Sequence, residues 1–155
     1  MQEKFKWKAK WTIEKRIEGE KDPYEIVEID GNLALTAGIQ LVWTAVAGGT
    51  ITAYDNTNAY LGVGDGTTAA TASDTALAGT NTAWVAMETS YPTYGSGNTI
   101  VFRSVFGSSV GNFDWQELAV GNGSAGGTLL NRKVTDQGTK VSGQSWTLTL
   151  TLSLS

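Results

Sequence analysis

Apolar and polar side chains alternate along residues 5–17, where the odd positions are mostly apolar and the even positions mostly charged. An alternation of period two places one kind of side chain on each face of a strand, as a half-buried β-strand requires. A polar turn at residues 18–23 and a second extended run at residues 24–29 follow. The pattern predicts an N-terminal β-hairpin whose register is set by its aromatic face.

Two interpretations of this hairpin stay open. It is either an edge hairpin of the main domain or an arm that packs its Trp-bearing face on a neighbouring subunit. As an arm, it divides the chain into a charged hairpin at residues 1–32 and a β-rich body at residues 33–155, and deletion of residues 1–30 should leave the body folded. The expected subunit or capsid contacts are then Phe5, Lys6, Trp7, Lys8, Lys10, Trp11, Ile13 and Arg16.

Residues 35–47 change from strand spacing to helical spacing. Their apolar side chains recur every three or four positions, which predicts one short amphipathic helix, and the glycines at positions 48 and 49 predict its C-cap. We expect this apolar stripe to pack on a sheet, with a partner-binding helix as the alternative. The stripe consists of Leu35, Ile39, Val42, Trp43 and Val46.

The rest of the chain is rich in Thr, Gly, Ser and Ala and contains short extended runs bounded by turn-forming residues. The last run alternates Trp or Leu with Thr or Ser, and its uncharged outer face favours a position inside a sheet or against another chain. We therefore predict an all-β fold, a β-sandwich or jelly-roll-like domain or a barrel, with one short helix. The runs are residues 50–54, 59–63, 84–88, 99–106, 113–120, 128–134 and 145–154, with loops at 107–112, 121–127 and 136–143.

Composition narrows the chemistry of this single-domain chain of 155 residues. It contains no His and no Cys, which excludes His-dependent nucleophilic catalysis, the usual zinc sites and disulfides. A net charge of −4 offers no general attraction to nucleic acid or to an anionic membrane. We expect no enzymatic activity, no cofactor, no metal, no nucleic-acid partner and no membrane partner. The charged side chains are also unevenly distributed, because fifteen of the 26 lie in the first 30 residues.

Two loop motifs could bind ligands but have simpler explanations. The glycine-rich residues 62–67 lack the lysine of a phosphate-binding loop and predict a strand that ends in a tight turn. Asp55, Asn56, Asn58 and Asp65 carry oxygen ligands, but their spacing does not match a calcium loop, and Asx-turns explain them.

The acidic and aromatic residues of the body give no clear catalytic or sugar-binding site. Asp114 and Glu117 are three positions apart, so on a strand they face opposite sides and cannot easily cooperate, and Glu88 lies elsewhere on an aromatic-rich run. Five aromatic residues could form the sandwich core, a subunit contact or a sugar-binding platform, and the core is the preferred interpretation. They are Trp84, Tyr91, Tyr94, Phe113 and Trp115.

Several blocks of sequence, in order from about residue 30 to the end, together resemble small virion structural proteins of tailed bacteriophages. They are residues 58–68, 74–79, 106–107 with 112–117, 130–133, and 138–140 with 143–149. Within that group the chain is most similar to capsid decoration (cement) proteins of long-tailed phages of thermophiles. The resemblance implies a β-rich domain that trimerises on the outer capsid surface at local three-fold positions, with extended arms that tie neighbours together.

We therefore expect a non-enzymatic, thermostable virion structural protein, made in the host cytoplasm and located on the capsid surface. Its expected partners are further copies of itself, as a homotrimer, and the major capsid protein. The alternatives are a phage tail or fibre component and, from another class, a carbohydrate-binding β-sandwich module.

Overall fold

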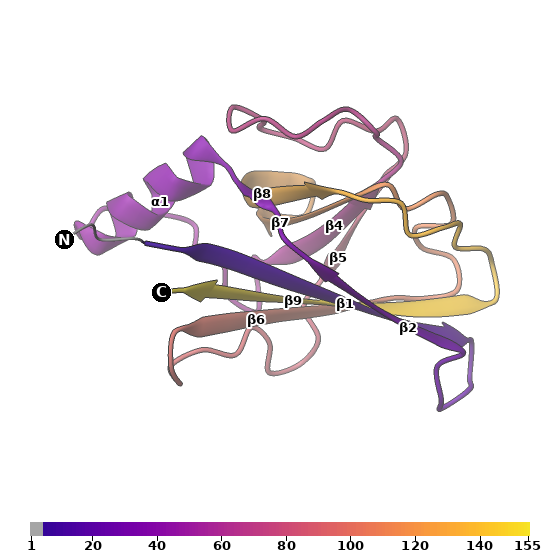
Figure 1. Cartoon of the computed structure of the whole chain (residues 1–155). Coiled ribbons are helices and arrows are strands. Elements are labelled where there is room, and N and C mark those ends of the chain that lie inside the picture. Colours follow the sequence, from indigo (N-terminus) through magenta and orange to yellow (C-terminus); the bar gives the residue numbers. More distant parts are fainter. Residues whose placement is uncertain (1–4) are drawn as a thin grey trace.

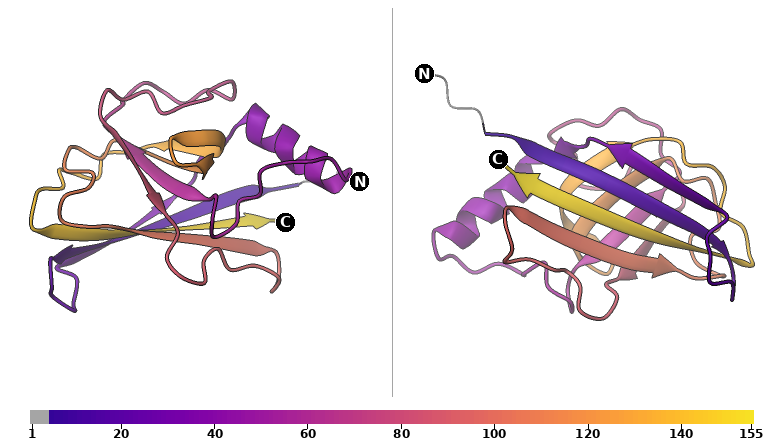
Figure 2. Two further views of the ribbon diagram at one scale, coloured as in Figure 1. Left: turned by 180° about the vertical axis from the view of Figure 1, so that it is seen from behind. Right: turned by 60° about the horizontal axis from the view of Figure 1, so that its bottom comes forward.

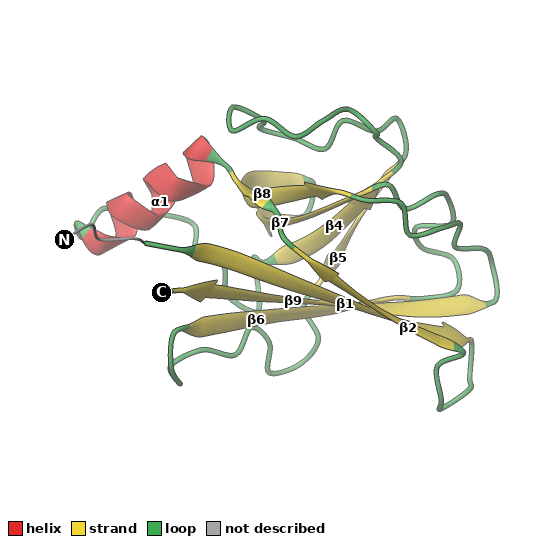
Figure 3. Cartoon of the chain, viewed as in Figure 1, coloured by secondary structure: helices red, strands yellow, loops and turns green. Residues whose placement is uncertain are grey.

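The computed structural model describes residues 5–155, which form two antiparallel β-sheets and one helix (Figure 1). The strand order is β2-β1-β9-β6 in sheet A and β3-β8-β7-β4-β5 in sheet B. The predicted all-β, sandwich-like fold with one short helix is confirmed (Figure 3). The elements are β1 (Trp7–Ile17), β2 (Glu25–Asp30), β3 (Leu33–Ala34), α1 (Thr36–Val46), β4 (Tyr60–Gly64), β5 (Thr82–Ala86), β6 (Thr99–Phe106), β7 (Glu117–Gly123), β8 (Gly126–Val134) and β9 (Gln144–Leu154).

The N-terminal hairpin is built into sheet A (Figure 2). β1 pairs with β9 along its full length, from Trp7 opposite Leu154 to Ile17 opposite Gln144, and with β2 on its other side. β1 is therefore an interior strand, and β2 alone of the two hairpin strands lies at the edge. The first four residues of the predicted segment 1–32 lie outside the described residues.

The core lies between the two sheets and is rich in aromatic side chains. The Trp115 ring packs edge-on against both Phe106 and Trp146, with ring centroids 4.9 Å apart in each pair. Such edge-to-face contacts are favoured by the ring quadrupole. The indole N–H of Trp115 donates to the carbonyl of Gly111 at 2.9 Å, so this buried ring keeps its hydrogen bond.

The last strand lies inside a sheet, as its uncharged outer face indicated. β9 pairs with β1 on one side and with β6 on the other. Its inward side chains, among them Leu148 and Leu150, are fully buried in the core. The backbone of β9 is therefore paired along both edges, so neither edge is left open for aggregation.

Three predicted boundaries are wrong. Residues 50–54 form no strand and connect α1 to β4. Residues 113–116 precede β7 because they pair with the loop at 137–140 instead of extending the sheet; for example, Trp115 N–H donates to Gly138 O. The predicted loop at 121–127 is mostly part of the β7–β8 hairpin, because β7 continues to Gly123 and β8 begins at Gly126. The two strands approach so closely here that a Cβ at Gly121 would lie only 1.8 Å from Gly126 O.

Candidate interaction surface and buried ion network

Helix α1 approaches sheet B closely at only one end. Gly38 lies against β8, where a Cβ on this residue would stand 2.6 Å from the Cα of Leu130. Leu35, directly before the helix, is fully buried and donates its N–H to the carbonyl of Leu130 at 3.0 Å. The helix then runs away from this contact toward the end of the molecule where β9 finishes (Figure 1). Gly48, with φ +80°, follows the helix end as predicted.

Of the other stripe residues, Val42 is half-buried and packs against the core, whereas the remaining three are exposed. Ile39, Trp43 and Val46 are 40%, 65% and 71% exposed, and Phe5, which lines a common hollow with Ile39 and Trp43, is 78% exposed. The expectation that the stripe packs on a sheet is therefore confirmed for Leu35 and Val42 and wrong for Ile39, Trp43 and Val46. The physical reason is the close approach at Gly38, which fixes the first turns on β8 while the later turns project past the sheet. We call Phe5, Ile39, Trp43 and Val46 the α1 surface.

Two apolar hollows adjoin the α1 surface. Their volumes are about 390 and 210 Å³. Three side chains, Trp7, Val42 and Leu154, line both hollows and separate one from the other. The larger one opens between the helix and the ends of sheet A, and it is also lined by Leu41, Ala45, Val46, Ile51, Tyr54, Asn98, Thr99, Ile100, Phe102 and Leu130. Burial raises the pKa of the Tyr54 hydroxyl, whose O–H donates to Thr128 O at the edge of this hollow.

The helical part of the α1 surface is also free of charge, whereas Phe5 is followed directly by the exposed Lys6. Residues 33–54 contain no Asp, Glu, Lys or Arg, although the chain as a whole has 26 such residues. Covering such a surface removes apolar area from water without desolvating an ion, so burial is favourable by roughly 25 cal/mol per Å². An exposed apolar patch of this kind is typical of an interaction site.

The contact residues predicted from the first strand divide into two groups. Trp11 and Ile13 are fully buried in the core of their own chain, so they are unavailable to a neighbour while the domain keeps this fold. Trp7 is half-buried between the two hollows. The exposed members are Phe5, Lys6, Lys8 and Lys10, and Arg16 is half-buried beside Glu14. The alternative of a partner-binding helix concerned Ile39, Trp43 and Val46 among others, and these three side chains are exposed.

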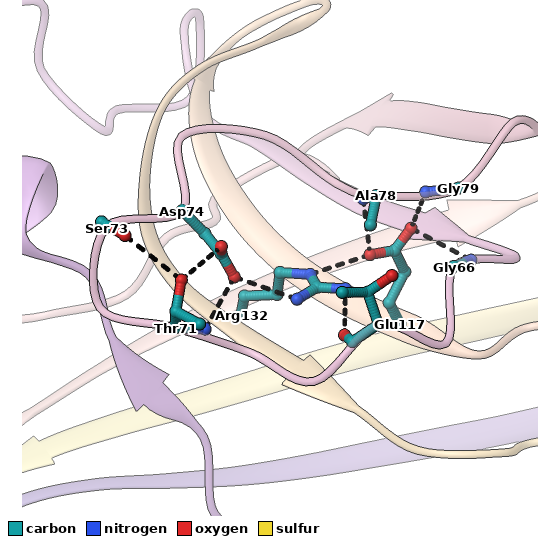
Figure 4. Close-up of polar contacts among 9 residues, drawn as sticks. Gly66, Thr71, Ser73, Asp74, Ala78, Gly79, Glu117 and Arg132 are labelled. Atoms are coloured by element: carbon teal, nitrogen blue, oxygen red, sulfur yellow. Dashed lines mark hydrogen bonds and ion pairs between the residues drawn. The ribbon is translucent and has the colours of Figure 1, made fainter.

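A buried ion pair lies on the outer side of sheet B, the side that faces away from sheet A (Figure 4). The Arg132 Nε–H donates to Glu117 Oε2 at 2.9 Å, and both side chains are almost fully removed from solvent. Arg132 also donates to Asp74 Oδ2 at 3.0 Å and to the carbonyl of Thr68 at 2.9 Å. The guanidinium thus reaches three separate acceptors, two of them in the long connection between β4 and β5.

The Glu117 carboxylate binds the backbone of that same connection. Its Oε1 accepts from the N–H groups of Gly66 and Gly79, at 3.2 and 2.7 Å, and its Oε2 accepts from Ala78 N–H at 2.9 Å. Together with Arg132, four donors occupy its two oxygens, so Glu117 has no oxygen directed at an open site. Its role is to hold residues 65–81, which we call the strap, over sheet B.

The glycine-rich motif has a structural explanation in this network. β4 ends at Gly64, as predicted. A Cβ at Gly64 or Gly66 would lie 2.4 or 2.6 Å from Glu117 Oε1, so the carboxylate fits only because these positions lack side chains. Asp65 accepts hydrogen bonds from the backbone and side chain of Asn81, which lower the pKa of its carboxyl.

The other candidate acidic groups also have local partners. Glu88 pairs with Arg103 at 2.8 Å, and Asp114 accepts a hydrogen bond from the Thr139 hydroxyl. Asp55 Oδ1 accepts from the backbone N–H groups of residues 57 and 58, the Asx-turn expected from the sequence. Within residues 5–155, no group of three or more acidic residues is placed to hold a metal ion.

The five aromatic residues do not share one surface. Trp115 is fully buried in the core, whereas Trp84 lies on the outer side of sheet B, in the space that Gly62 leaves free. Of the five, only Tyr94 is largely exposed, at 78%. The platform that a sugar-binding module needs is therefore absent from these residues.

Lys140 anchors a second loop. Its side chain is fully buried, and its Nζ donates to the carbonyl of Gly107 and to Asn112 Oδ1, each at 2.7 Å. Burial lowers the pKa of this amine. The contacts fix the loop at residues 107–112 against the segment that carries Lys140.

Within the described residues, the helix is too short to cross a membrane. Comparisons of this chain with protein families, with curated proteins and with solved structures found no match.

Proposed function

We propose that this protein is a non-enzymatic virion structural protein, a capsid decoration protein that binds the outer surface of a phage shell and stabilises it through contacts between subunits. The observation that carries the proposal is the uncharged α1 surface, an exposed apolar patch beside two apolar hollows on an otherwise well-packed domain. Protein–protein contact is the usual role of such a patch.

The sequence blocks that resemble phage virion proteins meet in space, which supports the resemblance. Residues 58–68, 74–79, 112–117 and 130–133 supply Gly66, Asp74, Glu117 and Arg132 respectively, and these four residues belong to one hydrogen-bonded network. The block at 138–140 supplies Lys140, which binds Gly107 and Asn112, both from the block at 106–107 with 112–117. The blocks therefore describe two anchoring sites of a rigid domain, as a protein that reinforces a shell would need.

The three acidic residues considered for catalysis all bind neighbouring groups of the fold. Glu117 is occupied by four donors, and Glu88 and Asp114 each have a neighbouring partner. A pair of carboxylates facing a shared cleft, which a glycoside hydrolase would require, is not formed by these three residues.

Binding to undecorated shells tests the proposal. The purified protein is mixed with shells assembled from the major capsid protein of the same genome, and the pellet is assayed after sedimentation. We expect saturable binding and a higher melting temperature of the decorated shells, because a ligand that binds only the folded assembly stabilises it. Localisation of a labelled copy by electron microscopy distinguishes head from tail. Absence of binding to shells, or a label confined to the tail, would contradict the decoration function.

A further inference from the structure

We infer that the α1 surface is a self-association surface, in which Trp43 of one copy enters the larger apolar hollow of another copy. The inference rests on the proposed assembly function for its biological setting, and it names the partner of this surface as a second copy of the chain. It concerns contacts between decoration subunits and assigns nothing to the contact with the shell.

The first reason is that one face carries both a projecting side chain and a hollow. Trp43 is 65% exposed, and the hollow of about 390 Å³ lies beside it on the other side of Val42. When both parts lie on one face, each copy can insert its Trp43 into the hollow of a neighbouring copy in a closed symmetric assembly. Tryptophan is enriched among the residues that contribute most to binding, because it buries a large rigid surface at low entropic cost.

The second reason is area. A fully buried aromatic side chain covers about 150–250 Å². At 65% and 78% exposure, Trp43 and Phe5 together offer roughly 200–350 Å² per copy. A stable interface needs about 800 Å² per partner. Trp43 and Phe5 alone cover less than this area, so the contact also needs Ile39, Val46 and the walls of the two hollows, which adjoin the aromatic pair.

The third reason is charge. Two copies of a chain with net charge −4 repel each other, but residues 33–54 contribute no charge to that repulsion. Helices that lie on membranes are usually rich in Lys and Arg on their polar face, and α1 has neither. A second copy presents an equally uncharged helix to this surface, so the two helices can meet without burying an ion.

The experiment measures mass in solution by sedimentation velocity and light scattering, over a range of concentrations, for the full chain and three variants. Trp43→Ala removes the projecting side chain. Val46→Lys places a cation at the last residue of α1, beside the larger hollow, where it suits the C-terminal end of a free helix but not a dry interface. Ile26→Ala is the matched control, because Ile26 is 57% exposed on the edge strand β2, away from α1. Circular dichroism and melting temperature verify that each variant is folded.

We expect the wild type and Ile26→Ala to form the same oligomer and the two α1 variants to dissociate, with a dissociation constant raised by about 30-fold or more. A monomeric wild type at its highest soluble concentration would overturn the inference, as would folded α1 variants that associate like the wild type. Binding of a monomeric wild type to neutral or anionic phospholipid vesicles, lost in Trp43→Ala, would assign the surface to lipid instead.

The outcomes of this experiment are separable from those of shell binding. A protein that is monomeric but binds shells retains the decoration function and loses the self-association surface. An oligomer that depends on Trp43 but fails to bind shells retains the surface and loses the decoration function.

Discussion

Arg132 and Glu117 form an ion pair at 2.9 Å with both side chains almost wholly shielded from solvent. The pair joins neighbouring strands β8 and β7, and through Asp74 and the backbone of the strap it joins them to residues 65–81. A buried pair of this kind is costly to break, because removing one partner leaves an uncompensated charge.

Replacing the arginine should therefore be strongly destabilising. We expect Arg132→Met to lower the free energy of unfolding by about 3–5 kcal/mol, measured by urea denaturation. Arg103→Met is the matched control, since Arg103 pairs with Glu88 but its side chain is 33% exposed, and its loss should be about 1 kcal/mol or less. Equal losses in the two variants would mean that the buried network does not stabilise the fold.

The close contact of α1 with β8 predicts an unusual effect of a helix-favouring substitution. Alanine is a better helix former than glycine by about 1 kcal/mol. Gly38→Ala should nevertheless destabilise the protein by about 1–3 kcal/mol, because its Cβ would overlap the backbone of Leu130. Gly107→Ala is the control, since no atom lies within 4 Å of the Cβ position there. A stabilised Gly38→Ala variant would show that the helix can move away from β8 freely.

Asp74 should make stability depend on acid pH. Its pKa is lowered from the ordinary 3.8, first by the hydrogen bond from the Thr71 backbone N–H, and also by the Thr71 hydroxyl and Arg132. The unfolded chain therefore binds a proton at higher pH than the folded one, so this contribution is complete above about pH 4 and is lost as the pH falls through the lower folded value.

The matched variant is Asp74→Asn, which keeps the shape and removes the charge. Urea denaturation at several pH values should show the wild type more stable at neutral pH, with the difference shrinking below about pH 4. A difference in the free energy of unfolding between the two proteins that stays constant down to the pH of acid unfolding would exclude the Asp74 carboxylate as its source.

Removal of the hairpin distinguishes a structural strand from an arm. Because β1 is interior and buries Trp11 and Ile13, we expect a chain lacking residues 1–32 to lose its cooperative thermal transition. Single Lys8→Ala and Lys10→Ala variants, which alter only exposed side chains, should change stability by about 0.5 kcal/mol or less. A folded truncated chain would support the arm interpretation of this segment.

Local spacing was sufficient to predict most of the strands. The alternation in residues 7–17 and 144–154 fixes which side chains face the core, so both strands were found within a few residues. The helix was found for the same reason, from the spacing of its apolar residues. Spacing along one element does not say what lies opposite it, and the exposure of Trp43 depends on how closely Gly38 approaches β8.

The anchoring network could not be predicted, because its members are distant in the sequence. Arg132 is 58 residues from Asp74 and 15 from Glu117. The β7–β8 pairing brings Arg132 to Glu117, and the folding of the strap over sheet B brings Asp74 to Arg132. Glu117 was considered as a catalytic acid beside Asp114. The glycines at 64 and 66 were the available signal, since two positions without side chains leave room for a neighbouring group.

The pairing of the two chain ends determines where this protein can be extended. Lys6 and Ser155 exchange backbone hydrogen bonds, so both ends of the described chain emerge beside the α1 surface. A peptide or fluorescent domain fused directly after Ser155 would stand next to the α1 surface and compete with any subunit that docks there. The turn at residues 18–23 lies at the opposite end of β1. A peptide or domain inserted there would be displayed away from the α1 surface.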